Sequence, residues 1–218
     1  MSSDTEVTTE TKPAETKPAE TKPAETKPAA KPAAKPAAKP AAKPAAKPAA
    51  KPAELPAFEK SISDKIVEKF GDKIEVEFVK ENRVGIKVNR DDIHDVAEFI
   101  RDGLNYDHVE SVSGVDYPQD KEIEVVYHIG SYSDSSLAKQ LLVLATRAQR
   151  EENPIPGKDA TKLPTLRDIF YSVEFHEREV FEMFGVYFTG HPDNRRLLLP
   201  EDWADLPPLR KDFAIKGR

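Results

Sequence analysis

A proline at every fourth or fifth position governs the first quarter of this sequence. From Glu10 the chain repeats ETKPA and then the shorter unit KPAA, which continues to about Ala53. Proline has no backbone N–H to donate, and its ring drives the preceding residue toward extended conformations. Such a stretch forms neither a helix nor an inner strand. We therefore expect residues 1–57 to be a disordered, polyproline-like tail, and the fold to lie in residues 58–218.

Composition changes at the same boundary. Residues 58–218 contain every aromatic residue and all five histidines, which is enough for one domain that hides roughly 70% of its unfolded surface. The tail carries ten lysines against seven acidic residues, so the chain's net charge of −6 divides into +3 for the tail and −9 for the domain. An acidic domain without a basic stripe argues against nucleic acid as a partner.

The tail itself allows two interpretations. It is either a tether that makes weak electrostatic contact with anionic lipid or an acidic neighbour, or a solubilising extension that the domain does not need.

The chain has no cysteine, which excludes disulfides, thiol nucleophiles and an iron–sulfur cluster held by its own thiolates. No apolar run reaches the roughly 18 residues that span a bilayer, and MSSDTEVTTE lacks the features of a secretory signal.

Hydrophobic periodicity predicts an α+β domain whose helices cover one face of a mostly antiparallel sheet, followed by an irregular C-terminal segment. We expect Asn89 or Asp91 to cap the second helix and Gly103 to end it. The expected elements are a helix over 58–70, a hairpin over 74–88, that second helix, and strands over 106–117 and 123–129.

Three later stretches are harder to assign. Residues 137–149 have helix-forming composition, but they would also suit a strand buried on both faces, and we favour the strand. Residues 151–162 contain prolines and a glycine and are expected to form a loop. Thr165, with Asp168 three residues on, resembles a capping box that opens a short helix through Tyr171.

The densest group of charged and aromatic side chains runs from His176 to Trp203. On a helical wheel, Glu177 falls inside an apolar arc that includes Phe181 and Phe184. A buried carboxylate needs a cation or backbone donors. We expect Glu177, in the first turn of its helix, to accept backbone donors, with Arg195 or Arg196 as a possible second partner.

The opposite side of this helix carries Arg178, Glu179 and Glu182, and the four-residue spacing predicts an Arg178–Glu182 ion pair. Gly185 is expected to end the helix before a short strand over 186–188. The turn over 190–194 would then present Arg195 and Arg196.

A catalytic interpretation of this group has weak support. His176, Glu177, Glu179 and His191 are metal-ligand types, but their spacing is not that of an HExxH site. Glu177 and Glu179 point about 160° apart on a helix, so they do not flank one bond. The sequence has no P-loop, GxGxxG or GxSxG motif. A stand-alone metal-dependent enzyme using His176, Glu177 and His191 stays open as the alternative.

The end of the chain, residues 190–213, combines prolines with Trp203 and the basic pairs Arg195–Arg196 and Arg210–Lys211. Arginine and tryptophan are enriched at the energetic centres of protein interfaces. We expect this segment to dock against another protein, although it could also wrap its own domain.

These residues also carry a family resemblance. ERE (177–179), EMF (182–184), GHPDNRRLLLPEDW (190–203) and PLRKDF (208–213) resemble the signature of the C-type subunits, the 30 kDa subunit family, of complex I-type NADH:quinone oxidoreductases. Related deazaflavin-dependent dehydrogenases and membrane-bound hydrogenases use the same module. SGVDY (113–117) and EVVYHI (124–129) resemble the family's central strands, so the resemblance covers about residues 58–218. Asn194 departs from it, since the family usually has an apolar residue there.

The resemblance implies a non-catalytic peripheral-arm subunit without cofactor or metal. The whole complex would move electrons from NADH or another reduced carrier to a quinone-like acceptor and couple this to ion translocation. Its neighbours would be the D-like subunit, which lines the quinone site, and the B-like and I-like iron–sulfur subunits, on the cytoplasmic side of the cell membrane. The residues expected to act in structure or at interfaces are Glu177, Arg178, Glu179, Glu182, His191, Arg195, Arg196, Trp203, Arg210 and Lys211.

Overall fold

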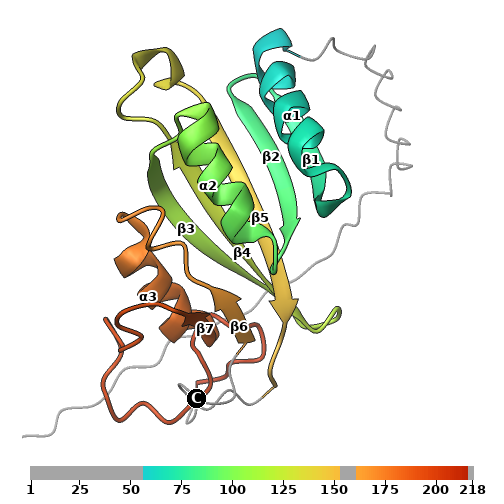
Figure 1. Ribbon diagram of the computed structural model, residues 1–218. Coiled ribbons are helices and arrows are strands. Elements are labelled where there is room, and N and C mark those ends of the chain that lie inside the picture. Colours follow the sequence, from blue (N-terminus) through green and yellow to red (C-terminus); the bar gives the residue numbers. More distant parts are fainter. Residues whose placement is uncertain (1–55, 153–160, 216–218) are drawn as a thin grey trace, which may run out of the picture. The chain divides into compact units, whose positions relative to one another are not determined.

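The structure is a computed structural model that describes residues 56–152 and 161–215 (Figure 1). Nearly all of the predicted tail and part of the predicted 151–162 loop lie outside the described residues. In chain order the elements are α1 (Ala57–Phe70), β1 (Ile74–Lys80), β2 (Arg83–Asn89), α2 (Ile93–Leu104), β3 (His108–Tyr117), β4 (Glu122–Gly130), β5 (Leu141–Gln149), β6 (Thr161–Pro164), α3 (Val173–Phe184) and β7 (Val186–Thr189). None of the described helices is long and apolar enough to cross a membrane.

The main sheet has five strands in the order β1-β2-β5-β4-β3. Three of its four pairings are antiparallel, and β2 pairs with β5 in parallel. The chain leaves β2, forms α2, β3 and β4, and returns along β5 to fill the gap beside β2. A separate two-stranded parallel sheet joins β6 to β7.

One face of the sheet forms the core. The register places Ile86 opposite Leu144, Leu144 opposite Tyr127, and Tyr127 opposite Val112, so these side chains form a row across four strands. The first three are fully buried. Figure 1 shows α1 and α2 lying over the sheet on a common face, with α3 next to β6 and β7.

Aromatic contacts and small residues bring the helices together. Phe70 at the end of α1 meets Phe99 of α2 edge to face, with ring centroids 5.7 Å apart. On β3, a Cβ built at Gly114 would lie 2.5 Å from the ring of Phe184. The missing side chain at Gly114 therefore lets α3 lie directly on the edge strand β3.

The predicted fold class is confirmed, as are the first helix, the hairpin and the strands that became β3 and β4. The preference for a strand in residues 137–149 is confirmed over Leu141–Gln149. Its predicted start was wrong, because Ser135–Leu137 form a 3-10 turn. The predicted 151–162 loop was also too long, since β6 begins at Thr161.

Two helix predictions were wrong in detail. The N-cap position of α2 is Asp92, which makes no side-chain capping bond, and the helix ends at Leu104 before the left-handed Asn105, which has φ 60°. The helix predicted after Thr165 is a run of turns. The Thr165 hydroxyl does accept the N–H of Arg167, as a cap would, but it also donates to Glu177. That second bond ties the turn to α3.

Candidate functional site

The site is built on α3 and on the stretch from Gly190 to Ile215, which we call the terminal segment. Gly185 ends α3 in the left-handed conformation with φ 75°, and its N–H bonds to the carbonyl of Phe181. The chain then forms β7 and turns at Gly190, whose φ is 88°. This turn sends the terminal segment back along α3, and Figure 1 shows the two running together.

Glu177 is a fully buried carboxylate enclosed by donors. It accepts the hydroxyl of Tyr127 at 3.2 Å, the hydroxyl of Thr165 at 2.5 Å and the N–H of Leu166 at 2.9 Å. The expectation of a caged carboxylate is confirmed. The expected backbone donor is confirmed by the N–H of Leu166, which precedes α3. The expected place in the first turn was wrong, because α3 begins at Val173, and the possible arginine partner is replaced by the hydroxyls of Tyr127 and Thr165.

Burial disfavours the ionised form of the Glu177 carboxyl group. Burial raises the pKa of Glu177 to about 7, while the bonds from Leu166, Thr165 and Tyr127 act to lower it. The pKa of Tyr127 is also raised well above its usual value, first by its own burial and then by the neighbouring carboxylate. The tyrosine therefore stays a neutral donor.

His191 is a buried structural imidazole. Its Nε2 donates to the carbonyl of Glu174 at 3.1 Å, and its Nδ1 accepts the N–H of Asp193 at 3.0 Å, as expected for a histidine bonded within its turn. Nε2 lies 3.9 Å from Glu177. Since both ring nitrogens are engaged, the ring is oriented to fasten the turn rather than to ligate a metal.

His176 does not complete a metal site with this pair. It is half-buried, and its Nδ1 has no hydrogen-bond partner among the residues described. Within the described part of the chain, no group of three or more histidine, aspartate or glutamate side chains is arranged to hold a metal ion. Glu179 lies exposed on α3.

The side chain of Glu182 binds backbone N–H groups of the terminal segment. It is 5% exposed and accepts three consecutive N–H groups, those of Leu197, Leu198 and Leu199, at 2.9–3.0 Å. Consecutive amides converging on one anion form a nest. The predicted Arg178–Glu182 ion pair was wrong: the three amides supply the donors that this carboxylate requires.

Arg178 binds the same segment from the preceding turn of α3. Its guanidinium donates to the carbonyls of Arg195 and Arg196, each at 3.0 Å, and pairs with Asp193 at 3.3 Å. Arg195 bonds to the same aspartate, and this bond, with help from Arg178, holds the pKa of Asp193 down to about 2. Arg178 and Glu182 therefore clamp the segment to α3 by its carbonyls and its amides.

Arg196 closes the next loop of the segment. It donates to the carbonyls of Pro200, Glu201 and Trp203 at 2.7–3.0 Å. Trp203 in turn donates to the carbonyl of Leu206 and packs on Phe213 at 6.0 Å between centroids. The structure thus places Arg196 and Trp203 within their own segment, in contacts that the sequence does not predict.

The PLRKDF ending fastens the segment to the main sheet. Arg210 is 3% exposed and donates to the carbonyls of Phe184 and Glu151, and burial together with the nearby Arg150 lowers its pKa to about 10. Asp116 of β3 accepts the N–H of Lys211 at 2.9 Å and pairs with Arg150 at 2.7 Å.

Asp116 and Arg150 were missed from the sequence, because only the sheet register brings them to the same end. Arg150 also pairs with Asp212 at 2.7 Å. The PLRKDF ending is therefore linked to the Arg150 guanidinium directly through Asp212, and indirectly through Asp116, which accepts the N–H of Lys211.

The chain is similar to known respiratory proteins. A family model described as "Respiratory-chain NADH dehydrogenase, 30 Kd subunit" matches residues 86–218. The C subunit of the F(420)H(2) dehydrogenase of Methanosarcina mazei is 36% identical over 131 residues, which is 60% of this chain and 75% of that protein. The joined C/D subunit of the NADH-quinone oxidoreductase of Phocaeicola vulgatus is 34% identical over 128 residues, which is 59% of this chain and 22% of that protein.

A solved structure is also similar. A chain in the membrane-bound sulfane sulfur reductase, described as an archaeal respiratory membrane complex, superposes with a TM-score of 0.60 at 29% identity. The match covers 72% of this chain and 86% of that one.

Proposed function

The chain belongs to the family of the 30 kDa subunit of respiratory-chain NADH dehydrogenases, and from this premise we propose that it is a non-catalytic docking subunit of a membrane-bound complex I-type oxidoreductase. In such a complex, electrons pass from a reduced carrier to a quinone-like acceptor, coupled to ion translocation. The names of the relatives differ in the carrier, F420H2 in one and NADH in another. The carrier is therefore a property of other subunits.

One observation carries the proposed non-catalytic role. Glu177 and His191, the two buried side chains of the candidate active site, have their polar atoms bonded within the fold. Glu177 accepts bonds from β4 and from the turn before α3, and His191 ties the terminal segment to the carbonyl of Glu174. Arg178, Glu182 and Arg196 bind backbone groups of the segment. An active site needs a reactive group that is free to meet a substrate. This group instead builds a shaped surface.

The partners follow from the same proposal. The C/D relative joins, under one name, a part similar to this chain and a second part that makes up most of its length. This supports a D-like subunit as the immediate neighbour. The family resemblance adds B-like and I-like iron–sulfur subunits, on the cytoplasmic side of the membrane. The ten expected interface residues then act mainly by shaping the segment that meets these partners.

A docking subunit and a stand-alone metal-dependent enzyme are expected to give different experimental results. Purified alone, the chain should contain no stoichiometric zinc or iron by elemental analysis. Cells that lack it should lose the assembled complex on native gels of solubilised membranes, and a plasmid copy should restore it. Stoichiometric metal in the isolated chain, or a complex of normal size without the chain, would overturn the docking role.

A further inference from the structure

Several exposed apolar side chains lie on α3 or on the chain segments beside it. The large apolar residues exposed within the family-matched span 86–218 are Tyr132, Tyr171, Phe175, Leu197, Leu198, Leu209 and Ile215. Four of them, Tyr171, Phe175, Leu197 and Leu198, belong to α3, the turn that leads into it, and the part of the terminal segment clamped on it. We call these four the leucine–aromatic patch. A partner shared across a family must be met by residues inside the shared span, so Phe58 and Val67 of α1 are set aside.

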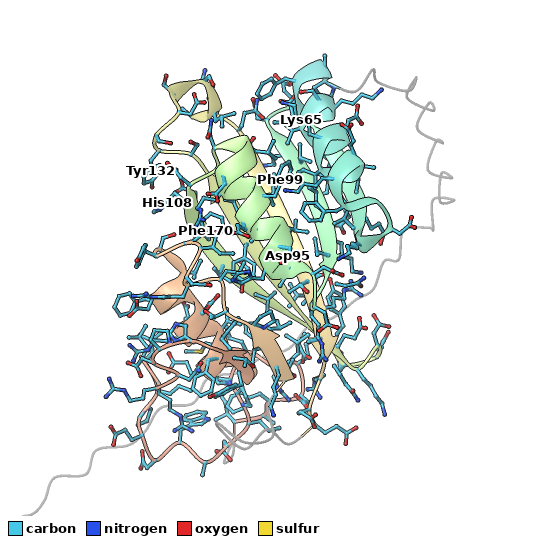
Figure 2. The ribbon with its side chains drawn as sticks, in the orientation of Figure 1. Lys65, Asp95, Phe99, His108, Tyr132 and Phe170 are labelled. Atoms are coloured by element: carbon cyan, nitrogen blue, oxygen red, sulfur yellow. The ribbon has the colours of Figure 1, made fainter. Side chains whose placement is uncertain are left out.

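Tyr132 is occupied elsewhere. It stacks on His108 with ring centroids 4.0 Å apart, its hydroxyl bonds to Glu110, and Figure 2 shows its side chain next to His108, away from α3. Leu209 and Ile215 lie beyond the part of the terminal segment that Arg178 and Glu182 bind, so the leucine–aromatic patch is the exposed group on the clamped unit. Large exposed apolar side chains grouped on one structural unit mark interaction sites.

The backbone of the patch is held rigidly. The amides of Leu197, Leu198 and Leu199 all bond to Glu182, while the side chains of the first two remain 41% and 64% exposed. Arg178 ties the preceding carbonyls to α3, and its guanidinium lies 5.8 Å from the centroid of the Phe175 ring. This arginine links the aromatic half of the patch to the leucine half. A surface ordered before binding loses less entropy on docking.

The charges around the patch are already paired. Arg167 lies 4.7 Å from the Tyr171 ring centroid and is bonded to Glu174 at 3.0 Å. Arg178 and Arg195 both pair with Asp193. The patch is therefore close to neutral within a strongly acidic domain, and it suits an apolar partner surface better than a charged one.

We propose that the leucine–aromatic patch is the surface that meets the D-like subunit, through an apolar depression that receives Leu197 and Leu198. This inference rests on the proposed function. The joined C/D relative supports the choice of occupant, since it keeps a part similar to this chain together with its D part in one protein. The arginines of the segment act by positioning the leucines, and the association should persist in high salt.

The experiment compares two variants of the tagged full-length chain in cells that lack the untagged one. Leu197→Ser with Leu198→Ser alters the patch, and Val67→Ser is the matched control, since Val67 is 42% exposed on α1 outside the family-matched span. Both sets of side chains are exposed, so the urea midpoints of the purified chains should match the wild type. Solubilised membranes are washed in 0.1 and about 0.5 M NaCl, where the screening length falls below about 5 Å. Recovery of the D-like subunit is then measured by quantitative mass spectrometry.

We expect the serine double variant to recover at least about tenfold less D-like subunit per tagged chain than the wild type, as loss of a central apolar anchor does. Val67→Ser and the high-salt wash should change recovery less than twofold. Equal recovery with the serine variant would overturn this inference alone. Failure of the wild type to recover the D-like subunit would instead remove the proposed function. Dimers of the isolated wild type that the serine variant abolishes would assign the patch to self-association and reject the proposal.

Discussion

The backbone N–H of Leu198 lies within hydrogen-bond distance of both carboxylate oxygens of Glu182, at 2.9 and 3.0 Å. This contact joins α3 to the terminal segment, which follows β7 in the chain. The amides of Leu197 and Leu199, on either side of Leu198, bond to the same carboxylate. A glutamate that a helical wheel places on the outer face is thereby buried. It determines the shape of the surface that we assign to docking.

Replacing Glu182 with alanine should loosen this segment without unfolding the domain. Hydrogen bonds to a charged group contribute about 2 kcal/mol each, which corresponds to roughly 30-fold faster amide exchange once the acceptor is lost. We expect that acceleration at Leu197, Leu198 and Leu199 in hydrogen-exchange mass spectrometry. Glu179→Ala, an exposed position on the same helix, is the control and should leave exchange at these amides unchanged. Equal exchange in both variants would mean that the nest does not order the segment.

Glu177 should make stability fall as the pH rises from about 4.5 to about 7. Its pKa is raised from 4.5 in the unfolded chain to about 7 in the fold, so the folded state binds the proton more tightly between these values. The stabilising effect is fully present below pH 4.5 and is lost as the pH rises toward 7, a change of at most about 3 kcal/mol.

Urea unfolding of Glu177→Gln and the wild type at pH 5, 6, 7 and 8 measures this effect. The glutamine mimics the protonated form at every pH, so the free energy of unfolding of the wild type should fall relative to that of the variant as the pH rises. A difference that is independent of pH would show that Glu177 titrates as it does in the unfolded chain.

Asp116 should contribute strongly to stability, because it is 2% exposed and binds both Arg150 and the backbone of Lys211. Asp116→Asn removes the buried charge that faces Arg150 and leaves this guanidinium paired with the half-exposed Asp212, which costs about 3 kcal/mol. The free energy of unfolding in urea should drop by that amount. The control is Asp120→Asn, whose side chain is 59% exposed and 4.0 Å from its arginine, and it should change stability by less than about 0.5 kcal/mol. Similar losses in both variants would contradict the assigned role.

Gly114→Ala should destabilise the contact between α3 and β3. The added Cβ would lie 2.5 Å from the ring of Phe184, and overpacking of this kind costs about 2 kcal/mol. Adding Phe184→Leu should recover part of the loss in thermal unfolding, because the ring that clashes is gone. At Gly130 a Cβ would meet only the end of the Glu110 side chain at 3.0 Å, so Gly130→Ala is the milder control. Strictly additive effects of Gly114→Ala and Phe184→Leu would argue against direct contact.

Deleting residues 2–55 tests the repeat tail. We predict that the shortened chain enters the complex as well as the full chain does, since the proposed docking residues all lie in 58–218. Native gels of membranes that carry either form measure this directly. Loss of the assembled complex would show that the tail is a necessary contact rather than a dispensable extension.

Sequence periodicity predicted most elements because hairpins and amphipathic helices are encoded by neighbouring residues. The parallel pairing of β2 with β5 was not predictable in this way, since Ile86 and Leu144 lie far apart in the chain. The site shows the same division. That Glu177 would be buried follows from the wheel, but its donors Tyr127 and Thr165 are brought to it only by tertiary folding.

Helical spacing is misleading at Arg178 and Glu182, where i,i+4 geometry permits an ion pair. Each side chain instead meets backbone groups of the terminal segment, which would otherwise lack partners. The resemblance indicated the importance of the arginine pair, but not that Arg196 bonds to three carbonyls of its own segment. That Leu197 and Leu198 remain exposed is visible only in the fold.

Whether the chain is a docking subunit is decided by affinity purification of the tagged wild-type chain from detergent-solubilised membranes, with identification and quantification of every co-purified protein. We expect the D-like and iron–sulfur subunits at about one copy per tagged chain, with reduced-carrier:quinone oxidoreductase activity in the same fraction. Recovery of the chain alone, or with metal and activity of its own, would contradict the docking role.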